Sequence, residues 1–304
     1  MNWQETLSIA ERRELLTLKD GRAWLSIALD WAHIGAAFAL VALAPNPLTV
    51  VVAIAVIGSR QLGLAILMHE AAHRILLSDR RWNDWVGNWV CAYPVYLDVH
   101  PYRKYHLRHH ARTWAADDPD LPLATPFPIT RASLRRKIWR DLSGQTGWKR
   151  LKYTLRGDLG MSPGLGQRSA NPGWQSFRGM VITNAVLLGL LTVAGHPALY
   201  LLWVAGWFTT YSLVTRIRSI AEHAAIPDPA DELGNTRTTL ARWWERLLVA
   251  PNYVNYHLEH HLLMTVPHYN LRRLHRLLRE RGVLASACVT NGYVAVLRLA
   301  SARP

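Results

Sequence analysis

Four long apolar runs, arranged as two closely spaced pairs, constrain the fold of this 304-residue chain more than any other feature. About 20 apolar residues in a helix are enough to cross a bilayer. Only three residues separate the first two runs, and only Gly195 and His196 separate the last two, so each pair predicts a helical hairpin. The third run is short and is expected to begin earlier, with Arg178 reaching the interface. The predicted transmembrane helices lie at about residues 24–44, 48–68, 178–194 and 197–217.

The charge distribution predicts which parts of the chain share one side of the membrane. Neither hairpin turn contains Lys or Arg, whereas the other polar segments are rich in both and bring the formal net charge to +14. Lys and Arg concentrate on the cytoplasmic side of membrane proteins. We therefore expect an all-α membrane protein with one domain over residues 1–304, four transmembrane helices in two hairpins, and a cytosolic helical cap formed by residues 69–177 and 218–304. Both termini are expected in the cytoplasm, at a bacterial inner membrane.

Composition supports a membrane location and limits the kinds of site. Half of the residues are hydrophobic and only 18% are charged, whereas soluble domains carry about 25% charged residues. The two cysteines, Cys91 and Cys288, are far apart and imply neither a disulfide framework nor a cysteine-based metal site. The N-terminal segment is too polar for a cleaved signal peptide, and it predicts an amphipathic helix at the membrane surface.

Several segments of the polar cap carry local signals. Trp82, Trp85 and Trp89 recur at helical spacing and predict a helix in the membrane interface. Residues 157–173 are crowded with Gly and Pro and predict a loop. Near the C-terminus, an amphipathic helix is expected with Asn270 as its N-cap.

Nine of the 14 histidines fall into groups, and their spacing predicts a metal site. Residues three or four apart on a helix share one face, so the first histidine of HxxxH or HxxHH shares a face with those that follow. The adjacent pair in HxxHH diverges by about 100° around the helix, so each such triplet can reach two neighbouring metals. Imidazole is a common ligand for iron, zinc and copper. The nine candidate ligands are His69, His73, His106, His109, His110, His223, His257, His260 and His261.

The remaining five histidines are expected to be structural or exposed, because they lie in or beside membrane helices or lack a ligand partner at helical spacing. They are His33, His100, His196, His268 and His275. The first group, HEAAH, also fits the HExxH sequence of zinc metalloproteases, with Glu70 as general base. That alternative requires one zinc ion and leaves seven grouped histidines unused, so the histidine count favours two metals.

Three sequence motifs resemble the histidine boxes of the membrane fatty-acid desaturase and hydroxylase superfamily. They are HEAAH, HLRHH followed by TWAADDPD, and NYHLEHHLLMTVPHYNL, and the resemblance covers roughly residues 24–280. His223 falls where members carry an isolated additional ligand. Two departures are notable: Ser219 stands where some acyl-CoA desaturases carry Asn, and the first box is HxxxH instead of the longer HxxxxH of those enzymes.

The resemblance implies a non-haem diiron centre that activates O2 and abstracts hydrogen from an unactivated C–H bond of a lipid taken from the bilayer. An alkyl C–H bond offers no polar group to acid–base catalysis, so a redox metal must carry the step. Zinc is expected to replace iron in some recombinant preparations. Carboxylates beside ligands commonly accept the second imidazole N–H, although they are also typical of solvated surfaces. The candidates for this role are Glu70, Glu222, Glu259 and Asp118, with Asp117 and Asp120 beside them.

Electrons are expected from a separate protein, because the chain has no Gly-rich dinucleotide loop after a strand. The resemblance implies a ferredoxin or a cytochrome-b5-like donor with its reductase. Between residues 131 and 156 there are nine Lys or Arg and a single Asp. This run can dock an acidic donor or bind anionic lipid headgroups, and no nucleic-acid motif accompanies it. The predicted docking residues are Arg135, Arg136, Lys137 and Arg140.

The histidine boxes are compatible with several reactions and substrates. Desaturation, hydroxylation and ketolation share such a metal site. Carotenoid-modifying enzymes carry similar histidine boxes, so the substrate is either an acyl lipid, with a fatty acyl chain preferred, or an isoprenoid.

Overall fold

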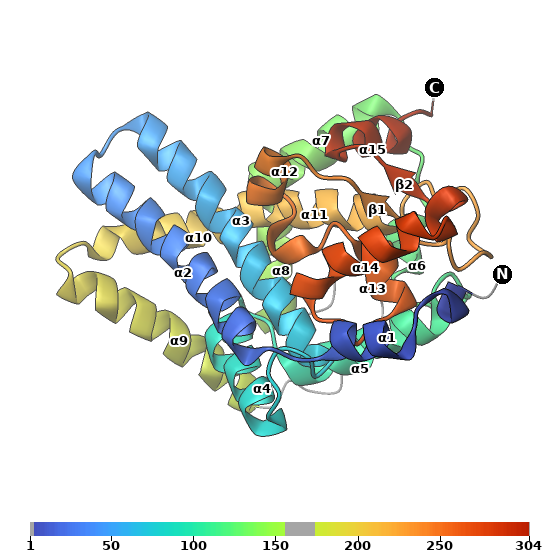
Figure 1. The fold of residues 1–304 in the computed structure, drawn as a ribbon. Helices are drawn as coiled ribbons and strands as arrows, with labels where there is room; N and C mark the ends of the chain where they lie inside the picture. The colour runs from blue at the N-terminus through green and yellow to red at the C-terminus, as the bar shows by residue number, and fades with distance from the viewer. Residues whose placement is uncertain (1–2, 156–173, 304) are drawn as a thin grey trace.

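The computed structural model describes residues 3–155 and 174–303, and this part of the chain is almost entirely helical (Figure 1). Its two strands, β1 (Thr238–Thr239) and β2 (Val289–Thr290), pair in parallel. The long helices lie together at one end of the molecule, while the shorter helices and both termini lie at the other (Figure 1). The predicted all-α architecture with a helical cap is confirmed.

Four helical segments are long and apolar enough to cross a membrane, as predicted. α3 has 26 residues, which span about 39 Å at about 1.5 Å per residue. A hydrocarbon core is about 30 Å thick, so α3 is longer than a straight crossing requires. The segments are α2 (Asp20–Leu43), α3 (Pro47–Ala72), α9 (Trp174–Val193) and the consecutive helices α10 (Tyr200–Phe208) and α11 (Thr210–His223).

Local chemistry fixes the two hairpin turns. The Asn46 side chain accepts hydrogen bonds from the backbone N–H groups of Leu48 and Thr49 and so caps α3, while Pro47 occupies the first helical position, where its missing N–H removes no helical bond. The second turn contains Gly195 with φ of +82°, a conformation that glycine adopts readily. A short 3-10 turn, η4 (Pro197–Leu199), follows it. Both turns lie at the end away from the cap (Figure 1).

Polar residues inside the apolar runs pair with one another. Arg60 of α3 forms an ion pair with Asp30 of α2 at 3.0 Å, and Gln61 donates a hydrogen bond to a backbone carbonyl of α10 at 2.9 Å. All three side chains are buried. The backbones approach closely beside them, since a Cβ on Gly58 would overlap Thr210 of α11. α3 is therefore the central helix, packed against α2, α10 and α11.

The fourth apolar segment is not one continuous helix. The sequence predicted a single helix at residues 197–217, but Thr209 has φ of −113° and ψ of −83° and separates α10 from α11. Close packing accompanies the break, because Gly147 of α8 lies against the backbone of Phe208. α11 then continues past residue 217 and brings His223 into the cap.

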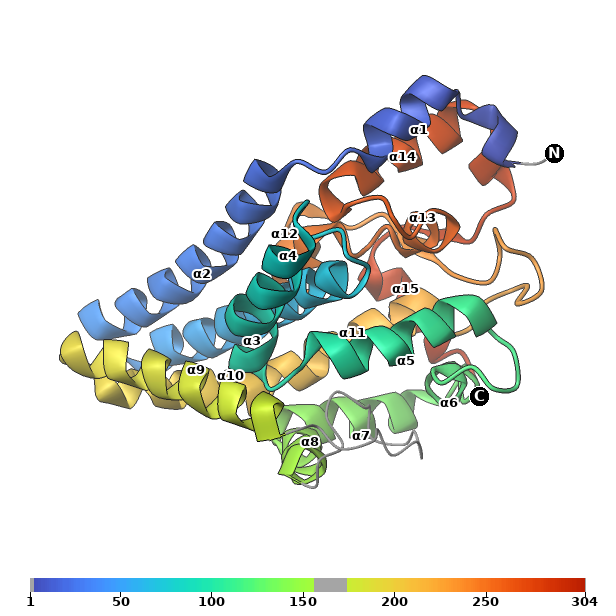
Figure 2. The same ribbon diagram turned by 90° about the horizontal axis from the view of Figure 1, so that it is seen from below.

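The cap consists of short helices gathered around the ends of α3 and α11 (Figure 2). Two of them, α5 and α13, carry the second and third histidine groups. In chain order the cap helices are η1 (Trp3–Thr6), α1 (Ile9–Leu16), α4 (Arg80–Val86), η2 (Gly87–Ala92), η3 (Tyr93–Val95), α5 (Val99–Arg112), α6 (Leu121–Ala124), α7 (Arg131–Leu142), α8 (Gln145–Leu155), α12 (Trp243–Leu248), η5 (Pro251–Tyr253), α13 (His257–Leu262), α14 (His268–Glu280), η6 (Val283–Ala285) and α15 (Tyr293–Ala300).

Two local predictions need correction. The tryptophan row is helical but not one α-helix: α4 ends at Val86, and the chain continues as the π-helical turn η2 and the 3-10 turn η3, where Pro94 cannot donate a helical hydrogen bond. Asn270 does not cap α14, which begins at His268; its amide instead donates to the carbonyl of Leu15 at 2.8 Å. The loop predicted at residues 157–173 lies outside the described residues.

The predicted N-terminal helix forms as α1, and it packs on the cap. Leu15 is fully buried against α14, and Glu14 forms an ion pair with Arg273 of that helix. Glu11 pairs with Arg281 directly after it. Figure 2 shows α1 lying along α14, so the N-terminal segment closes one side of the cap.

Candidate metal centre

The first histidine group stands at the end of α3. His69 belongs to the last helical turn and His73 is the C-cap residue. The i, i+4 spacing places both imidazoles on one face, with ring centroids 4.8 Å apart. Since α3 is the central helix of the membrane bundle, it holds this pair at the boundary between the bundle and the cap.

Three further elements bring the other grouped histidines to the same place. α5 begins at the N-cap Asp98, whose carboxylate accepts a hydrogen bond from the backbone N–H of His100, and the helix presents the HLRHH triplet. α13 presents the HLEHH triplet, and the end of α11 presents His223. Segments far apart in the sequence therefore converge at one point.

The nine imidazoles converge into two adjoining groups. Within each group the candidate ligand atoms all lie within 4.8 Å of one another. The groups meet where the ring centroids of His110 and His261 are 4.2 Å apart. The five-histidine group consists of His69, His73, His106, His110 and His260, and the four-histidine group consists of His109, His223, His257 and His261.

Helical geometry explains how each HxxHH triplet divides between the groups. In α5, His106 and His110 are four residues apart and point into the five-histidine group, while His109 points into the other. In α13 the assignment is reversed, because His257 and His261 share the four-histidine group and His260 leaves it. Each triplet thus contributes to both groups, as the divergence of adjacent helical residues predicts.

The spacing of the nitrogens fits a metal ion in each group. The Nε2 atoms of His106 and His110 are 2.9 Å apart, those of His110 and His260 are 3.0 Å apart, and those of His223 and His257 are 2.9 Å apart. Metal–imidazole bonds of about 2.0–2.1 Å that meet at about 90° place two ligand nitrogens about 2.9 Å apart. Two imidazoles bound to one ion at right angles would have this separation.

Buried nitrogens without hydrogen-bond partners provide a second test of the fit. A buried polar atom without a partner costs about 1–3 kcal/mol, and native proteins carry few of them. Here several such atoms belong to the candidate ligands: Nδ1 and Nε2 of His69, Nε2 of His73, Nε2 of His109, Nδ1 of His260 and Nε2 of His261. Metal ions coordinated by one nitrogen of each imidazole would supply partners for the four Nε2 atoms, and would leave Nδ1 of His69 and of His260 without one.

Burial also keeps most of these imidazoles in the neutral form that binds metals. Burial and the neighbouring imidazole of His69 lower the pKa of His73 to about 3. Burial likewise lowers the pKa of His106, His257, His260 and His261 well below the ordinary value. His109 differs: burial lowers its pKa, but the hydrogen bond to Asp118 and the charges of Asp120, Asp118 and Glu222 together outweigh burial and raise it.

Three of the predicted carboxylates adjoin candidate ligands. Asp118 lies 2.8 Å from Nδ1 of His109, Glu222 lies 3.4 Å from Nδ1 of His257, and Glu70 lies 3.7 Å from Nδ1 of His69. In each case the carboxylate is nearest Nδ1, so Nε2 of the same histidine stays available to a metal. Such carboxylates fix the tautomer and the ring orientation of a ligand.

The fourth carboxylate, Glu259, contacts different partners. It accepts hydrogen bonds from the hydroxyl of Thr238 in β1 and, at 2.6 Å, from Nδ1 of His275 in α14. It therefore ties α13 to β1 and α14. Of the two further acids, Asp117 pairs with Arg112 on the surface, while Asp120 approaches His109 to 3.7 Å.

The five remaining histidines lie outside both groups. His268 and His275 are buried, and each contacts a carboxylate, Glu70 and Glu259 respectively. Nδ1 of His33 lies 2.6 Å from a carbonyl of its own helix. His100 and His196 are exposed. Sequence spacing separated these residues from the grouped ones, but it gave no signal of the two buried histidine–carboxylate pairs.

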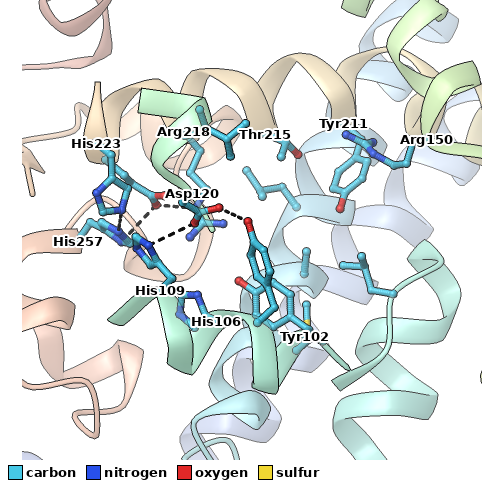
Figure 3. A pocket seen from close by; sticks show the side chains of 18 of the residues that line it. Tyr102, His106, His109, Asp120, Arg150, Tyr211, Thr215, Arg218, His223 and His257 are labelled. Carbon is cyan, nitrogen blue, oxygen red and sulfur yellow. Dashed lines mark hydrogen bonds and ion pairs between the residues drawn. The ribbon is translucent and has the colours of Figure 1, made fainter. Parts of the chain in front are cut away.

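A cavity of about 140 Å³ adjoins the two groups. Side chains of both reach it, with His106 from one group and His109, His223 and His257 from the other. Figure 3 shows His223 and His257 at one end of this cavity and Tyr211 and Arg150 at the opposite end. Its remaining wall combines apolar residues of α3 with the polar side chains Tyr102, Tyr105, Asp120, Thr215 and Arg218.

Comparison with known proteins places this arrangement in a family. A family model described as "Fatty acid desaturase" matches residues 45–289. The chain belongs to the fatty acid desaturase family. It is an oxidoreductase, and its four apolar helices are those of an integral membrane protein. Family membership leaves the zinc-protease interpretation of HEAAH without support, since that interpretation used only the first histidine group.

Individual relatives are distant but cover most of the chain. A dihydrorhizobitoxine desaturase from Bradyrhizobium elkanii is 27% identical over 83% of this chain and 73% of its own length. An omega-6 fatty acid desaturase, chloroplastic, from Brassica napus is 23% identical over 88% of this chain and 62% of its own length. An sn-1 oleoyl-lipid 12-desaturase from Synechocystis sp. is 24% identical over 88% of this chain and 79% of its own length.

Several cavity residues of this protein were not predicted from the sequence. Arg218 forms an ion pair with Glu222 four residues later on α11, a spacing that the sequence does show. Tyr105 donates a hydrogen bond to Asp120 across the α5–α6 connection. Arg150 reaches the cavity from α8, and only the packing of α8 on α10 and α11 places it there.

The four residues predicted to dock an electron donor all lie on α7. Arg135 and Arg136 are exposed, whereas Lys137 and Arg140 are partly buried. Arg135, Arg136 and Arg140 line an open depression beside the exposed Trp139. α7 therefore presents a basic surface in the cap.

Proposed function

We propose that this protein is an O2-dependent diiron desaturase in which the five-histidine group holds one iron ion and the four-histidine group holds the other. The observation that carries the proposal is the convergence of nine imidazoles from four separate elements into two adjoining groups. The nitrogen separations near 2.9 Å and the buried nitrogens without partners support it. Iron is the metal of choice, because imidazole suits it and the substrate bond requires redox chemistry.

The roles of the chain follow from this assignment. When bound, the iron pair supplies the activation of O2 and the removal of hydrogen from carbon, which no side chain can perform. Asp118 and Glu222 hold His109 and His257 in the tautomer that directs Nε2 inward, and the charge of Glu70 lies beside His69. Buried walls such as Leu62 and Met68 keep water from the cavity beside the groups.

We propose desaturation of a fatty acyl chain as the reaction. The relatives described above are all desaturases by name, and two of those names refer to a fatty acid or an oleoyl lipid. A site at the end of α3 lets an apolar chain enter from the bilayer. Hydroxylation of the same substrate, or oxidation of a carotenoid or another isoprenoid, would give products that differ in oxygen content or carbon skeleton.

The electron supply is proposed to be a separate acidic protein, a ferredoxin or a cytochrome-b5-like carrier with its reductase. The donor is proposed to bind the basic surface of α7, where Arg135 and Arg136 are exposed. Opposite charges mainly accelerate association of such pairs. We also propose that the cap, both termini and the metal centre face the cytoplasm of a bacterium, because the hairpin turns at the opposite end carry no Lys or Arg.

Product analysis in a host cell tests the proposed function. The gene is expressed in a bacterium with added iron and a compatible donor, and total lipids are compared by mass spectrometry with those of cells expressing the His106→Ala variant. The proposal expects lipid species that have lost two hydrogens only with the unaltered protein. A gain of oxygen would identify a hydroxylase, and unchanged lipids with an iron-loaded, reduced enzyme would refute a role in lipid oxidation.

A further inference from the structure

Arg150 occupies an unusual position for a cation in a lipid-oxidising enzyme. It lines the cavity beside the two histidine groups, at the end opposite His223 and His257 (Figure 3). Its guanidinium carbon lies 4.7 Å from the ring centroid of Tyr211 and 5.5 Å from that of Trp207. These rings hold the guanidinium in place through cation–π contacts. One Nη atom also lies 3.3 Å from the hydroxyl of Ser212.

Within the described part of the chain, Arg150 has no carboxylate partner. The acids that line or adjoin its cavity are engaged elsewhere. Asp141 pairs with Arg216, Glu222 pairs with Arg218, and Asp120 accepts the Tyr105 hydroxyl. Burial lowers the pKa of Arg150, and the nearby Tyr211 and Asp141 oppose this shift without cancelling it.

A second cavity of about 300 Å³ leads to the same arginine. It shares Leu123, Arg150, Thr215 and Ser219 with the cavity beside the histidines, so the two spaces adjoin. Four further cations line it: Lys137, Arg140, Lys149 and Arg216. Burial and the nearby charges of Arg216 and Arg140 lower the pKa of Lys137. The cations therefore exceed the acids in this space.

We propose that the substrate carries an oxyanion, which Arg150 binds while the rest of the molecule extends toward the two histidine groups. The proposal rests on the proposed function and specifies its substrate class. Guanidinium binds carboxylate or phosphate through two parallel hydrogen bonds. An uncharged acyl chain in the same cavity would leave the partly buried cation of Arg150 without a carboxylate or phosphate partner, which is unfavourable. A free carboxylic acid and a phosphate-bearing lipid headgroup both supply this chemistry.

Binding of matched probes to the purified, iron-loaded protein in detergent tests the proposal without requiring turnover. The probes are octanoate, octyl phosphate and methyl octanoate, which share an eight-carbon chain and differ in the anionic group. Equilibrium dialysis with labelled probes is expected to show at least tenfold tighter binding of one or both anions than of the ester. The tighter of the two anions identifies the source of the oxyanion. Equal affinities for all three, or preference for the ester, would overturn the proposal.

Variants in α8 locate the binding site. Arg150→Gln is expected to reduce anion binding at least tenfold and to leave ester binding unchanged, and Arg150→Lys is expected to retain an intermediate affinity. The matched control is Lys152→Gln, which removes an exposed cation of the same helix outside both cavities. Equal anion affinity in Arg150→Gln and the control, at unchanged iron content, would refute the role of Arg150. If no lipid product forms while the anions still bind through Arg150, the proposed function fails and the anion site stands.

Discussion

Asp118 provides the sharpest perturbation of the four-histidine group. Its carboxylate lies 2.8 Å from Nδ1 of His109, and both side chains are at most 4% exposed. The same carboxylate accepts hydrogen bonds from the backbone N–H groups of Trp114 and Asp120 at 2.9 Å. Asp118→Asn keeps the shape of the side chain, but its amide can donate to Nδ1. Donation would place the imidazole proton on Nε2, where the metal must bind.

The magnitude follows from the loss of this one contact. Mutation of a carboxylate that orients a metal-bound histidine typically weakens metal binding about 10- to 100-fold. This corresponds to about 1.4–2.8 kcal/mol. We expect Asp118→Asn to lie in this range and to affect the four-histidine group alone, because Asp118 contacts no ligand of the other group. The variant should therefore lose one of its two irons first.

Chelator titration measures the effect. Iron per chain is determined by mass spectrometry after dialysis against increasing chelator concentrations. Asp118→Asn should release one iron at about 10- to 100-fold lower chelator than the unaltered protein. The control is Asp117→Asn, which changes an exposed neighbour paired with Arg112. Identical release curves for the two variants would refute the assigned role of Asp118.

Further predictions concern other parts of the molecule. His106→Ala and His260→Ala should abolish product formation, whereas His33→Ala and His275→Ala should retain it. Equal loss of product in all four variants would contradict the division of the histidines into metal ligands and structural residues. The double variant Arg135→Glu, Arg136→Glu should slow reduction of the enzyme by an acidic donor and leave its iron content unchanged. Reduction rates measured by stopped flow should become equal for the variant and the unaltered protein at high salt. If the variant instead loses binding to anionic vesicles and is reduced at the normal rate, α7 binds lipid headgroups and not the donor. Arg60→Met should lower the free energy of unfolding by about 3–5 kcal/mol, because it leaves the buried Asp30 without its ion-pair partner. Thermal unfolding in detergent should show a smaller decrease in stability for the double variant Arg60→Met, Asp30→Leu.

The membrane architecture could be predicted because a bilayer dictates helix length and hydropathy directly. The hairpins follow from short polar connections such as Pro45–Pro47. The sequence did not show the break at Thr209, because it accompanies the packing of Gly147 against Phe208. It also misplaced the start of α14, since Pro267 precedes the helix and Asn270 serves a contact with Leu15.

The splitting of each triplet could also be predicted, because adjacent helical residues such as His109 and His110 diverge, but spacing alone does not show which of the two His106 joins. Which histidines of each triplet enter which group depends on how α5 and α13 face each other, and this is a tertiary property. The same holds for Arg150, which stands far from every histidine motif in the sequence and reaches the site only through the packing of α8. For Glu259 the sequence position was misleading: it directly precedes His260 and His261, yet its carboxylate contacts His275 and Thr238.

Location of the metals tests the central claim most directly. Iron-edge anomalous diffraction from crystals of the iron-loaded protein reports the position of each ion. The proposal predicts two peaks per chain, one enclosed by the five-histidine group and the other by the four-histidine group. A single peak held by His69 and His73, with the remaining seven imidazoles free of metal, would contradict the diiron assignment.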